Sequence, residues 1–168
     1  MRHGVGLLIL TDIPKIGRVA VMQIRGKYNS EEKRRQYFAG GCQVTIYGGI
    51  QSGESLKKAI FREAKEELGK KIVSILKRKK LVKLTEFKRG QESGKIYATV
   101  LNYKFLNKIC FGPDTAGIKL VTPSDLKRSV DLSKLKFGVK KHTLAIFSDT
   151  KKALKLAFRI FSPVDLKD

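Results

Sequence analysis

The sequence predicts one domain of the α/β class, with strands and helices interleaved along the chain. Short apolar runs bounded by turn-forming residues, which are typical of strands, alternate with longer segments of helix-forming residues. The chain is 168 residues long, close to the roughly 150 residues of an average domain, and it contains neither internal repeats nor low-complexity tracts. We therefore expect residues 1–168 to form a single domain.

The first quarter of the chain is predicted to consist mainly of strands. The apolar runs Gly4–Leu10 and Arg18–Ile24 are separated by a turn that contains Asp, Pro and Gly, a pattern typical of an antiparallel pair. The charged stretch Arg25–Gln36 suits an exposed loop. A short strand, Gln43–Tyr47, is expected after the glycine pair that precedes it.

A helix is predicted next, over Ser55–Leu68. This segment is rich in helix formers, follows the glycine-punctuated loop Gly48–Gly53, and ends at Gly69, a residue common at the carboxyl ends of helices.

Three further strands are predicted in the second half of the chain, at Leu81–Phe87, Lys95–Phe105 and Ile118–Val121, with a turn at Gly90–Gly94 joining the first two. In the middle strand, alternation predicts one shared face, which contains Tyr97, Thr99, Leu101, Tyr103 and Phe105.

Two helices are predicted toward the carboxyl end. Thr122–Asp125 has the composition of a helix start, with Pro at the first helical position. A helical region over Val139–Phe161 follows, which is either continuous or divided in two at Ser148–Thr150. Its apolar residues at helical spacing are Leu154, Ala157, Phe158 and Phe161.

The composition restricts the classes of partner and the compartment. Thirty-six Lys and Arg against fifteen Asp and Glu give a net charge of +21, which favours polyanions such as nucleotides, RNA or anionic membrane without choosing among them. The two cysteines form neither a disulfide framework nor a Cys-x-x-Cys pair, so we expect a cytoplasmic protein. No apolar run approaches the roughly 20 residues of a membrane helix, and we expect no membrane partner.

The predicted helix over Ser55–Leu68 carries a group of three carboxylates. Glu63, Glu66 and Glu67 are related as i, i+3 and i+4 and fall within an arc of about 100°. Glu67 lies inside the edge of the apolar stripe, where a carboxylate needs a compensating cation. One interpretation is a solvated face paired with lysines. The position of Glu67 favours a divalent ion with oxygen ligands, for which magnesium is the best fit.

The segment from Gly48 to Lys70 resembles the signature of the Nudix hydrolase family. That signature has seven fixed positions, and all of them match here, at Gly48, Glu54, Arg62, Glu63, Glu66, Glu67 and Gly69. With each residue type at roughly 6–7% usage, a chance match at any given start has odds below about one in ten million. Ala64 and Lys70 depart from the bulky aliphatic residues of the pattern, but neither departure removes an oxygen ligand.

The resemblance implies a Nudix-type α/β/α sandwich with a mixed β-sheet and a pyrophosphohydrolase that acts on acid anhydrides. The implied reaction is Mg²⁺-dependent hydrolysis of a diphosphate linkage in a nucleoside diphosphate derivative: a nucleotide sugar, a dinucleoside polyphosphate or a nucleoside triphosphate. Mn²⁺ is expected to substitute for Mg²⁺. By resemblance, Glu63, Glu66 and Glu67 hold the metal, with the backbone carbonyl of Tyr47 as a further ligand, and Arg62 belongs to the catalytic set.

Further site residues follow from the same resemblance. An ion pair between Glu54 and Arg62 is expected to fix the loop, and Gly48, Gly53 and Gly69 are expected to permit its tight path. The general base is either a glutamate of the signature or an acid from a later loop. Asp114 is the preferred candidate outside the signature, although an Asp that follows Pro also has an ordinary turn-forming role.

Two alternatives remain open at the level of sequence. Seven basic residues and no acid lie between Glu67 and Glu86, which motivates an RNA 5′-end pyrophosphohydrolase; the high lysine content of the whole chain explains much of this basic block. The other alternative is a non-catalytic Nudix-fold module that binds a nucleotide or RNA. The intact set of carboxylates argues against the second alternative. The sequence does not indicate an oligomeric state.

Overall fold

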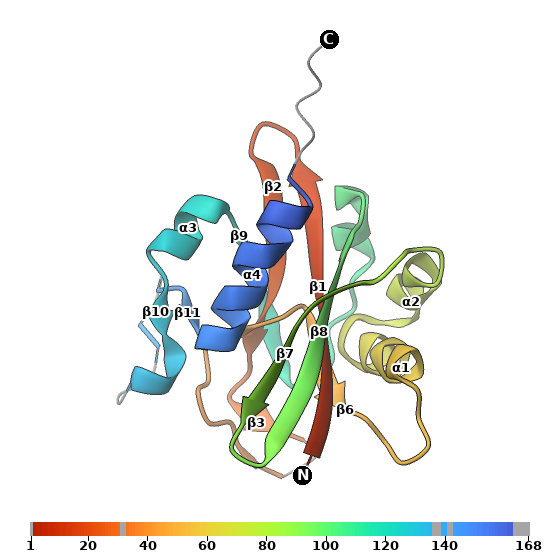
Figure 1. The fold of residues 1–168 in the computed structure, drawn as a ribbon, viewed down its shortest axis with the longest axis vertical. Helices are drawn as coiled ribbons and strands as arrows, with labels where there is room; N and C mark the ends of the chain where they lie inside the picture. Colours follow the sequence, from red (N-terminus) through yellow and green to blue (C-terminus); the bar gives the residue numbers. More distant parts are fainter. Residues whose placement is uncertain (1, 31–32, 136–138, 141–142, 163–168) are drawn as a thin grey trace.

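The computed structural model describes residues 2–30, 33–135, 139–140 and 143–162. A central sheet is flanked by helices (Figure 1). The strands are β1 (Arg2–Ile13), β2 (Gly17–Arg25), β3 (Tyr28–Asn29), β4 (Arg34–Arg35), β5 (Cys42–Gln43), β6 (Ile46–Gly49), β7 (Val82–Arg89), β8 (Glu92–Val100), β9 (Thr115–Val121), β10 (Val130–Asp131) and β11 (Ala145–Ile146). The helices are α1 (Leu56–Leu68), α2 (Lys70–Leu76), α3 (Pro123–Lys127) and α4 (Ser148–Ile160), with 3-10 helices η1 (Tyr103–Lys108) and η2 (Leu132–Lys134).

Strand β1 is the centre of a mixed sheet. Within the part of the chain described, its order is β5-β2-β1-β8-β7, with β6 paired to β1 and β9 to β2. β1 runs parallel to β8, while its other edge is antiparallel to β6 at Gly4–Leu7 and to β2 at Ile9–Ile13. β2 therefore leaves β1 halfway along, and residues 42–49 fill the fork, because β5 pairs with β2 and β6 with β1.

Helices cover both faces of the sheet, which confirms the predicted α/β/α sandwich. Successive side chains of a strand point to opposite faces, so a strand buried on both sides is apolar throughout. Leu7 and Ile9 of β1 pack with residues of α1 and α2, whereas Leu8 and Leu10 pack with residues of α3 and α4. Figure 1 shows α1 and α2 to one side of the sheet and α4 across the other. No helix among the described residues has both the length and the apolar character needed to cross a membrane.

Local sequence signals predicted several elements correctly. The first two strands pair antiparallel, with Ile9 opposite Val21. α1 begins after Ser55, whose side chain accepts from the backbone N–H of Lys58, and it ends at Gly69 with a φ of 93°. α3 begins at Pro123 behind a capping box formed by Thr122 and Asp125.

Other predicted boundaries are wrong. The strand expected over Lys95–Phe105 ends at Val100, and Tyr103–Lys108 form η1 because the side chain of Asn102 caps the backbone N–H of Lys104. Tyr103 and Phe105 therefore leave the predicted strand face. The predicted strand Gln43–Tyr47 is two separate pieces, β5 and β6, which pair with different partners across the fork.

The C-terminal helix starts later than the sequence indicated. Of the predicted helical region Val139–Phe161, residues 141–142 lie outside the described residues, and α4 begins only at Ser148. Ala145–Ile146 instead form β11, buried and parallel to β10. Two further features were not predicted: α2, which follows Gly69 directly, and the short β3–β4 pairing inside the stretch Arg25–Gln36.

Candidate active site

Glu63 reaches the sheet because a glycine faces it. In α1 the residue Glu63 is 8% exposed, on the same face as Ala59 and Ala64, which pack on the sheet. A Cβ built on Gly48 of β6 would overlap the carboxyl group of Glu63. Gly48 is therefore needed for the close approach of a carboxylate to the β6 backbone, and this need does not depend on backbone flexibility.

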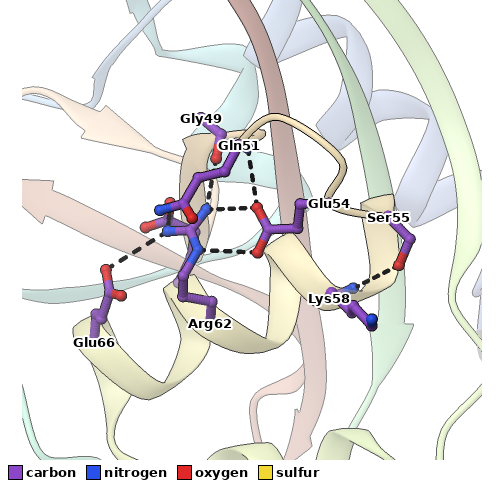
Figure 2. A network of polar contacts seen from close by, with 8 residues as sticks. Gly49, Gln51, Glu54, Ser55, Lys58, Arg62 and Glu66 are labelled. Carbon is purple, nitrogen blue, oxygen red and sulfur yellow. Dashed lines mark hydrogen bonds and ion pairs between the residues drawn. The ribbon is translucent and has the colours of Figure 1, made fainter.

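Arg62 ties the loop before α1 to the carboxylates. Its guanidinium donates from Nε to Glu54 Oε1 and from Nη2 to Glu54 Oε2, both at 3.0 Å, so the expected ion pair is present and bidentate (Figure 2). Nη2 also donates to the Gly49 carbonyl at 2.7 Å, and Nη1 donates to Glu63 Oε1 at 2.6 Å. Glu66, which is exposed, lies 3.8 Å from Nη1. The hydrogen bonds from Arg62 lower the pKa of Glu54, and those carboxylates raise the pKa of Arg62.

Glu67 is part-buried, and its carboxyl group is the most perturbed of the three acids. Burial raises the pKa of its carboxyl group to about 8, and the nearby carboxylates of Glu63 and Glu66 contribute to the rise. Two neutral donors act in the opposite direction. The backbone N–H of Tyr47 donates to Glu67 Oε2 at 3.2 Å, and the nearby side-chain amide of Gln23, which donates to Thr115, also lowers the pKa. A part-buried carboxylate with neutral neighbours of this kind lacks the charge compensation that its position requires.

The backbone of Tyr47 faces the same acid. Tyr47 lies opposite Gly6 in the β1–β6 pair, yet its N–H is directed at Glu67 and away from β1. In a strand the N–H and C=O of one residue point to the same side, so the Tyr47 carbonyl faces the α1 carboxylates too. The Tyr47 ring points elsewhere: it packs against Phe87, and its hydroxyl donates to Glu92, which together with burial raises its pKa.

The donor set fits a hard divalent cation. Among the described residues, no three His, Cys, Asp or Glu side chains are disposed to hold a metal ion as they stand. Arg62 explains this, because its guanidinium is the cation beside Glu63 and Glu66. Glu67 accepts from the neutral N–H of Tyr47 instead, and carboxylate and carbonyl oxygens are the ligands that Mg²⁺ prefers. Glu63, Glu66, Glu67 and the Tyr47 carbonyl would be the residues that hold it.

The three carboxylates open onto a large cavity of about 1030 Å³. Its wall includes Gly48, Glu63, Glu66 and Glu67, and a volume of this size is at the upper end of the range for small-molecule sites, about 300–1,000 Å³. The wall also includes arginines and the aromatic side chains of Tyr37, Phe38, Phe87 and Phe147.

Asp114 lines the same cavity but is engaged by a neighbouring loop. Both carboxylate oxygens accept from the backbone N–H of Ser30, at 3.0 and 3.1 Å, and the Asp114 carbonyl accepts from Gly26 at 2.9 Å. The loop that carries Asp114 also contacts the end of α1, where the N–H of Gly112 donates to the Glu67 carbonyl. Asp114 thus connects the β3–β4 segment to the end of α1.

Gly53 and Gly69, the two other glycines that were expected to permit the tight path of the loop, have positive φ. Gly53 has a φ of 73° and Gly69 a φ of 93°, a region that residues with a side chain adopt at a cost. Gly53 shapes the loop before Glu54, and Gly69 separates α1 from α2.

A family model described as the NUDIX domain matches residues 17–141, more than half of the chain. The chain belongs to the Nudix family. The predicted enzyme class, a Nudix-type pyrophosphohydrolase, is confirmed with it. Among proteins with a curated description, none matches this Nudix chain.

Solved structures share the fold at low sequence identity. A mutT/nudix family protein from Listeria innocua matches with a TM-score of 0.66 and 19% identity, over 95% of this chain and 92% of that one. A C. elegans Ap4A hydrolase matches with a TM-score of 0.53 and 14% identity, over 74% and 82%. A bifunctional NMN adenylyltransferase/ADP ribose pyrophosphatase from Francisella tularensis, complexed with AMP and a manganese ion, matches with a TM-score of 0.61 and 15% identity, over 95% and 41%.

Sequence reasoning missed the polar residues that β2 contributes to this Nudix site. Val19 and Val21 are buried in the sheet, and Gln23 and Arg25 continue the same face into the cavity. The change from apolar to polar along alternate positions of this strand was the signal that could have identified them. In contrast, none of the described residues that line the cavity belongs to the basic block between Glu67 and Glu86.

Proposed function

We propose that this Nudix protein hydrolyses a diphosphate linkage in a nucleoside diphosphate derivative, with Mg²⁺ held by Glu63, Glu66 and Glu67. The observation that carries the proposal is the environment of Glu67: a part-buried carboxylate beside two others, which accepts from the neutral backbone N–H of Tyr47 and opens to a large cavity. Such a group needs a cation, and a diphosphate that enters the cavity supplies further oxygen ligands for one.

The reaction adds one water molecule across a P–O–P bridge. A new bond forms between the water oxygen and phosphorus, the bridging P–O bond breaks, and the bridging oxygen leaves on the other phosphate as a proton passes to a base or to solvent. When bound, the metal ion neutralises diphosphate charge and polarises the attacking water. The protein supplies positioning: Arg62 holds Glu63 and the Gly49 carbonyl, while the Tyr47 N–H orients Glu67.

The comparisons support the substrate class and the metal in general terms. One similar structure is described as an Ap4A hydrolase, and another as an ADP ribose pyrophosphatase complexed with AMP and a manganese ion. Each of these proteins acts on, or binds, a nucleotide with a phosphate group. We extend that class to this chain, with Mn²⁺ as a substitute for Mg²⁺.

The first experiment measures phosphate release and metal binding together. Purified protein is incubated with Mg²⁺ and ADP-ribose, a dinucleoside tetraphosphate, ATP and 5′-triphosphorylated RNA, while Mn²⁺ binding is followed by calorimetry. We expect Glu66→Gln and Glu67→Gln each to lower turnover at least about a hundredfold, as for loss of a group that acts in the transition state. Both variants should also weaken Mn²⁺ binding.

Lys65→Gln is the matched control, since Lys65 is an exposed residue of the same helix. It should leave both turnover and Mn²⁺ binding near the parent values. Normal turnover in Glu67→Gln would sink the assignment of this acid. Nucleotide or RNA binding without hydrolysis of any substrate would favour the non-catalytic module.

We also propose a cytoplasmic location, which is supported by two free cysteines, Cys42 in the core and Cys110 at the surface. Of these two thiols, that of Cys42 is buried and that of Cys110 is exposed. A tagged protein found outside the reducing compartment would contradict this proposal.

A further inference from the structure

The cavity wall is selectively rich in arginine. The chain contains 26 Lys and 10 Arg, so a wall that sampled the charged surface at random would carry mostly lysine. Among the described residues that line the cavity there are five arginines and no lysine. They are Arg2, Arg25, Arg34, Arg35 and Arg89. A high lysine content accounts for the basic block after α1. It cannot account for a cavity wall that contains arginine and no lysine among its described residues.

Arginine and lysine differ in what they recognise. The planar guanidinium presents paired N–H donors that match two oxygens of one phosphate, whereas lysine binds as a point charge. A wall that uses arginine alone is suited to phosphate groups in fixed positions. Arg89 is engaged by Asp149, which lines the same cavity. Because the three carboxylates of α1 already account for the diphosphate under attack, the groups that Arg25, Arg34 and Arg35 match are phosphates beyond it.

Arg25 is placed one step along the sheet from the carboxylates. Gln23 and Glu67 line the same cavity, the Gln23 amide lies close enough to lower the pKa of Glu67, and Arg25 lies two residues further along β2, about 7 Å away on the same face. Gln43 donates to the side-chain oxygen of Gln23 and accepts from Arg25 Nη1 at 2.8 Å. Gln36 accepts from Arg25 Nη2 at 2.6 Å. These two amides orient the guanidinium toward its place in the cavity wall.

Arg34 and Arg35 sit on the β3–β4 hairpin, which is anchored beside the same site. Ser30, between the two strands of the hairpin, donates its N–H to Asp114, and the loop of Asp114 is bonded to the end of α1. The guanidinium of Arg34 stacks on the Tyr37 ring at 4.8 Å, which restricts its position. Figure 1 shows β3 and β6 at the same end of the molecule.

We propose that the cavity selects substrates with a 5′-phosphate chain of three or more phosphates, whose outer phosphates bind Arg25, Arg34 and Arg35. The inference rests on the proposed hydrolysis and narrows its substrate class. A nucleotide sugar would place a neutral ring against these guanidinium groups and offer their donors no anionic oxygens, which lowers its affinity relative to a longer phosphate chain.

The test compares substrates in parent and variant proteins. The ratio of kcat/KM for ATP to that for ADP-ribose should exceed about 10 in the parent and fall at least about tenfold in Arg34→Gln/Arg35→Gln, chiefly through KM for ATP. Both arginines are exposed, so the fold is expected to survive, and unfolding temperatures check this.

Arg78→Gln/Lys79→Gln is the matched control, because it removes the same two charges from exposed positions away from the cavity. It should leave the ratio as in the parent. A parent that prefers ADP-ribose, or a ratio unaffected by the double substitution in the hairpin, would overturn the inference.

Two further measurements are needed. One identifies the source of the phosphate chain, and the other distinguishes failure of this inference from failure of the proposed hydrolysis. 5′-Triphosphorylated RNA used as well as or better than ATP would identify an RNA end as the source, and ATP alone would identify a free nucleotide; either supports the inference. Equal competition by 5′-hydroxyl RNA would show backbone binding instead and contradict it. Calorimetry with a methylene-bridged ATP analogue measures binding without hydrolysis. Loss of this binding in Arg34→Gln/Arg35→Gln, in a protein that hydrolyses nothing, would keep the inference while the proposed function fails.

Discussion

Gly48 and Glu63 are in such close contact that a side chain on the first would occupy the position of the carboxyl group of the second. The obstructed group is the end of a flexible side chain, so Gly48→Ala should displace Glu63 and spare the fold. We expect turnover to fall about a hundredfold, the cost of a displacement of about 1 Å in a catalytic site. The unfolding temperature should change by only a few degrees. Steady-state rates and thermal unfolding measure the two effects.

Gly49→Ala is the control for this substitution. Gly49 is the next residue of β6, is exposed, and has open space within 4 Å of the position that a Cβ would take. Its backbone carbonyl, which accepts from Arg62, is retained in the variant. Equal losses of turnover in both variants would mean that the contact with Glu63 has no special importance.

Replacement of Arg62 by lysine tests the guanidinium as a connector. Arg62 contacts Glu54, Glu63 and the Gly49 carbonyl at once, and an ammonium group cannot reproduce the bidentate contact with Glu54. We expect Arg62→Lys to keep the charge, lower kcat at least about tenfold and lower the unfolding temperature. Lys65→Arg, an exposed change on the same helix, should do neither. A lysine variant with parental kcat would show that charge alone is sufficient at position 62.

The parts of the fold that were predicted correctly are those set by neighbouring residues. Ser55 and Gly69 define the ends of α1 through a side-chain cap and a positive φ, and both signals are visible in the sequence. The spacing of Glu63, Glu66 and Glu67 likewise fixes their common side of a helix. Local helix geometry was sufficient to predict that the three acids lie together. The fixed positions of the signature were needed to predict the family to which the chain belongs.

The parts that could not be predicted depend on contacts between distant segments. The fork in the sheet, where β2 leaves β1 and residues 42–49 enter, brings Gln23 to Glu67 and divides the predicted strand Gln43–Tyr47. The arginines of the cavity come from segments far apart in the chain, with Arg2 and Arg89 as the extremes. A run of charges in the sequence reports only neighbours along the chain, so it indicated the basic block after α1. The arginines of the cavity are neighbours in space, and no run of charges in the sequence could indicate them.

The raised pKa of Glu67 predicts how stability changes with pH in metal-free protein. Its carboxyl group keeps a proton up to about pH 8 in the folded state but loses it near 4.5 when unfolded. The folded state therefore binds the extra proton, and stability falls as pH rises from about 4.5 to about 8. At about 1.4 kcal/mol per pKa unit the effect amounts to several kcal/mol. Urea unfolding in chelator at about pH 5 and about pH 9 measures it.

Glu67→Gln should remove most of that loss, because a neutral amide has no proton to release. The variant is then expected to be more stable than the parent at the higher pH, although it is the less active protein. Lys65→Gln is the control, since Lys65 is an exposed residue of the same helix and should leave the dependence on pH as in the parent. A parent whose stability is flat across this range would contradict the part-buried, cation-deficient description of Glu67.

Metal addition should act in the opposite direction at high pH. An ion that binds only the folded state stabilises it by about 2.7 kcal/mol at a concentration about one hundred times its Kd. Since ionised Glu67 is the better ligand, we expect Mg²⁺ to raise the unfolding temperature more at about pH 9 than at about pH 5. The Glu67→Gln variant should respond weakly at both values. An increase of the same size in parent and variant would indicate binding elsewhere.

Two substitutions of Asp114 distinguish a catalytic base from a residue that anchors a loop. Its carboxylate oxygens both accept from the Ser30 N–H, so Asp114→Asn keeps one acceptor for this contact while it removes the basic group. We expect Asp114→Asn to retain kcat within about tenfold, because loss of a true general base costs on the order of 10²–10⁴. Asp114→Ala loses the anchor of the β3–β4 hairpin and should raise KM, most of all for a triphosphate that binds Arg34 and Arg35. The opposite pattern, a kcat collapse in Asp114→Asn with KM unchanged, would make Asp114 the base and leave the Ser30 contact incidental.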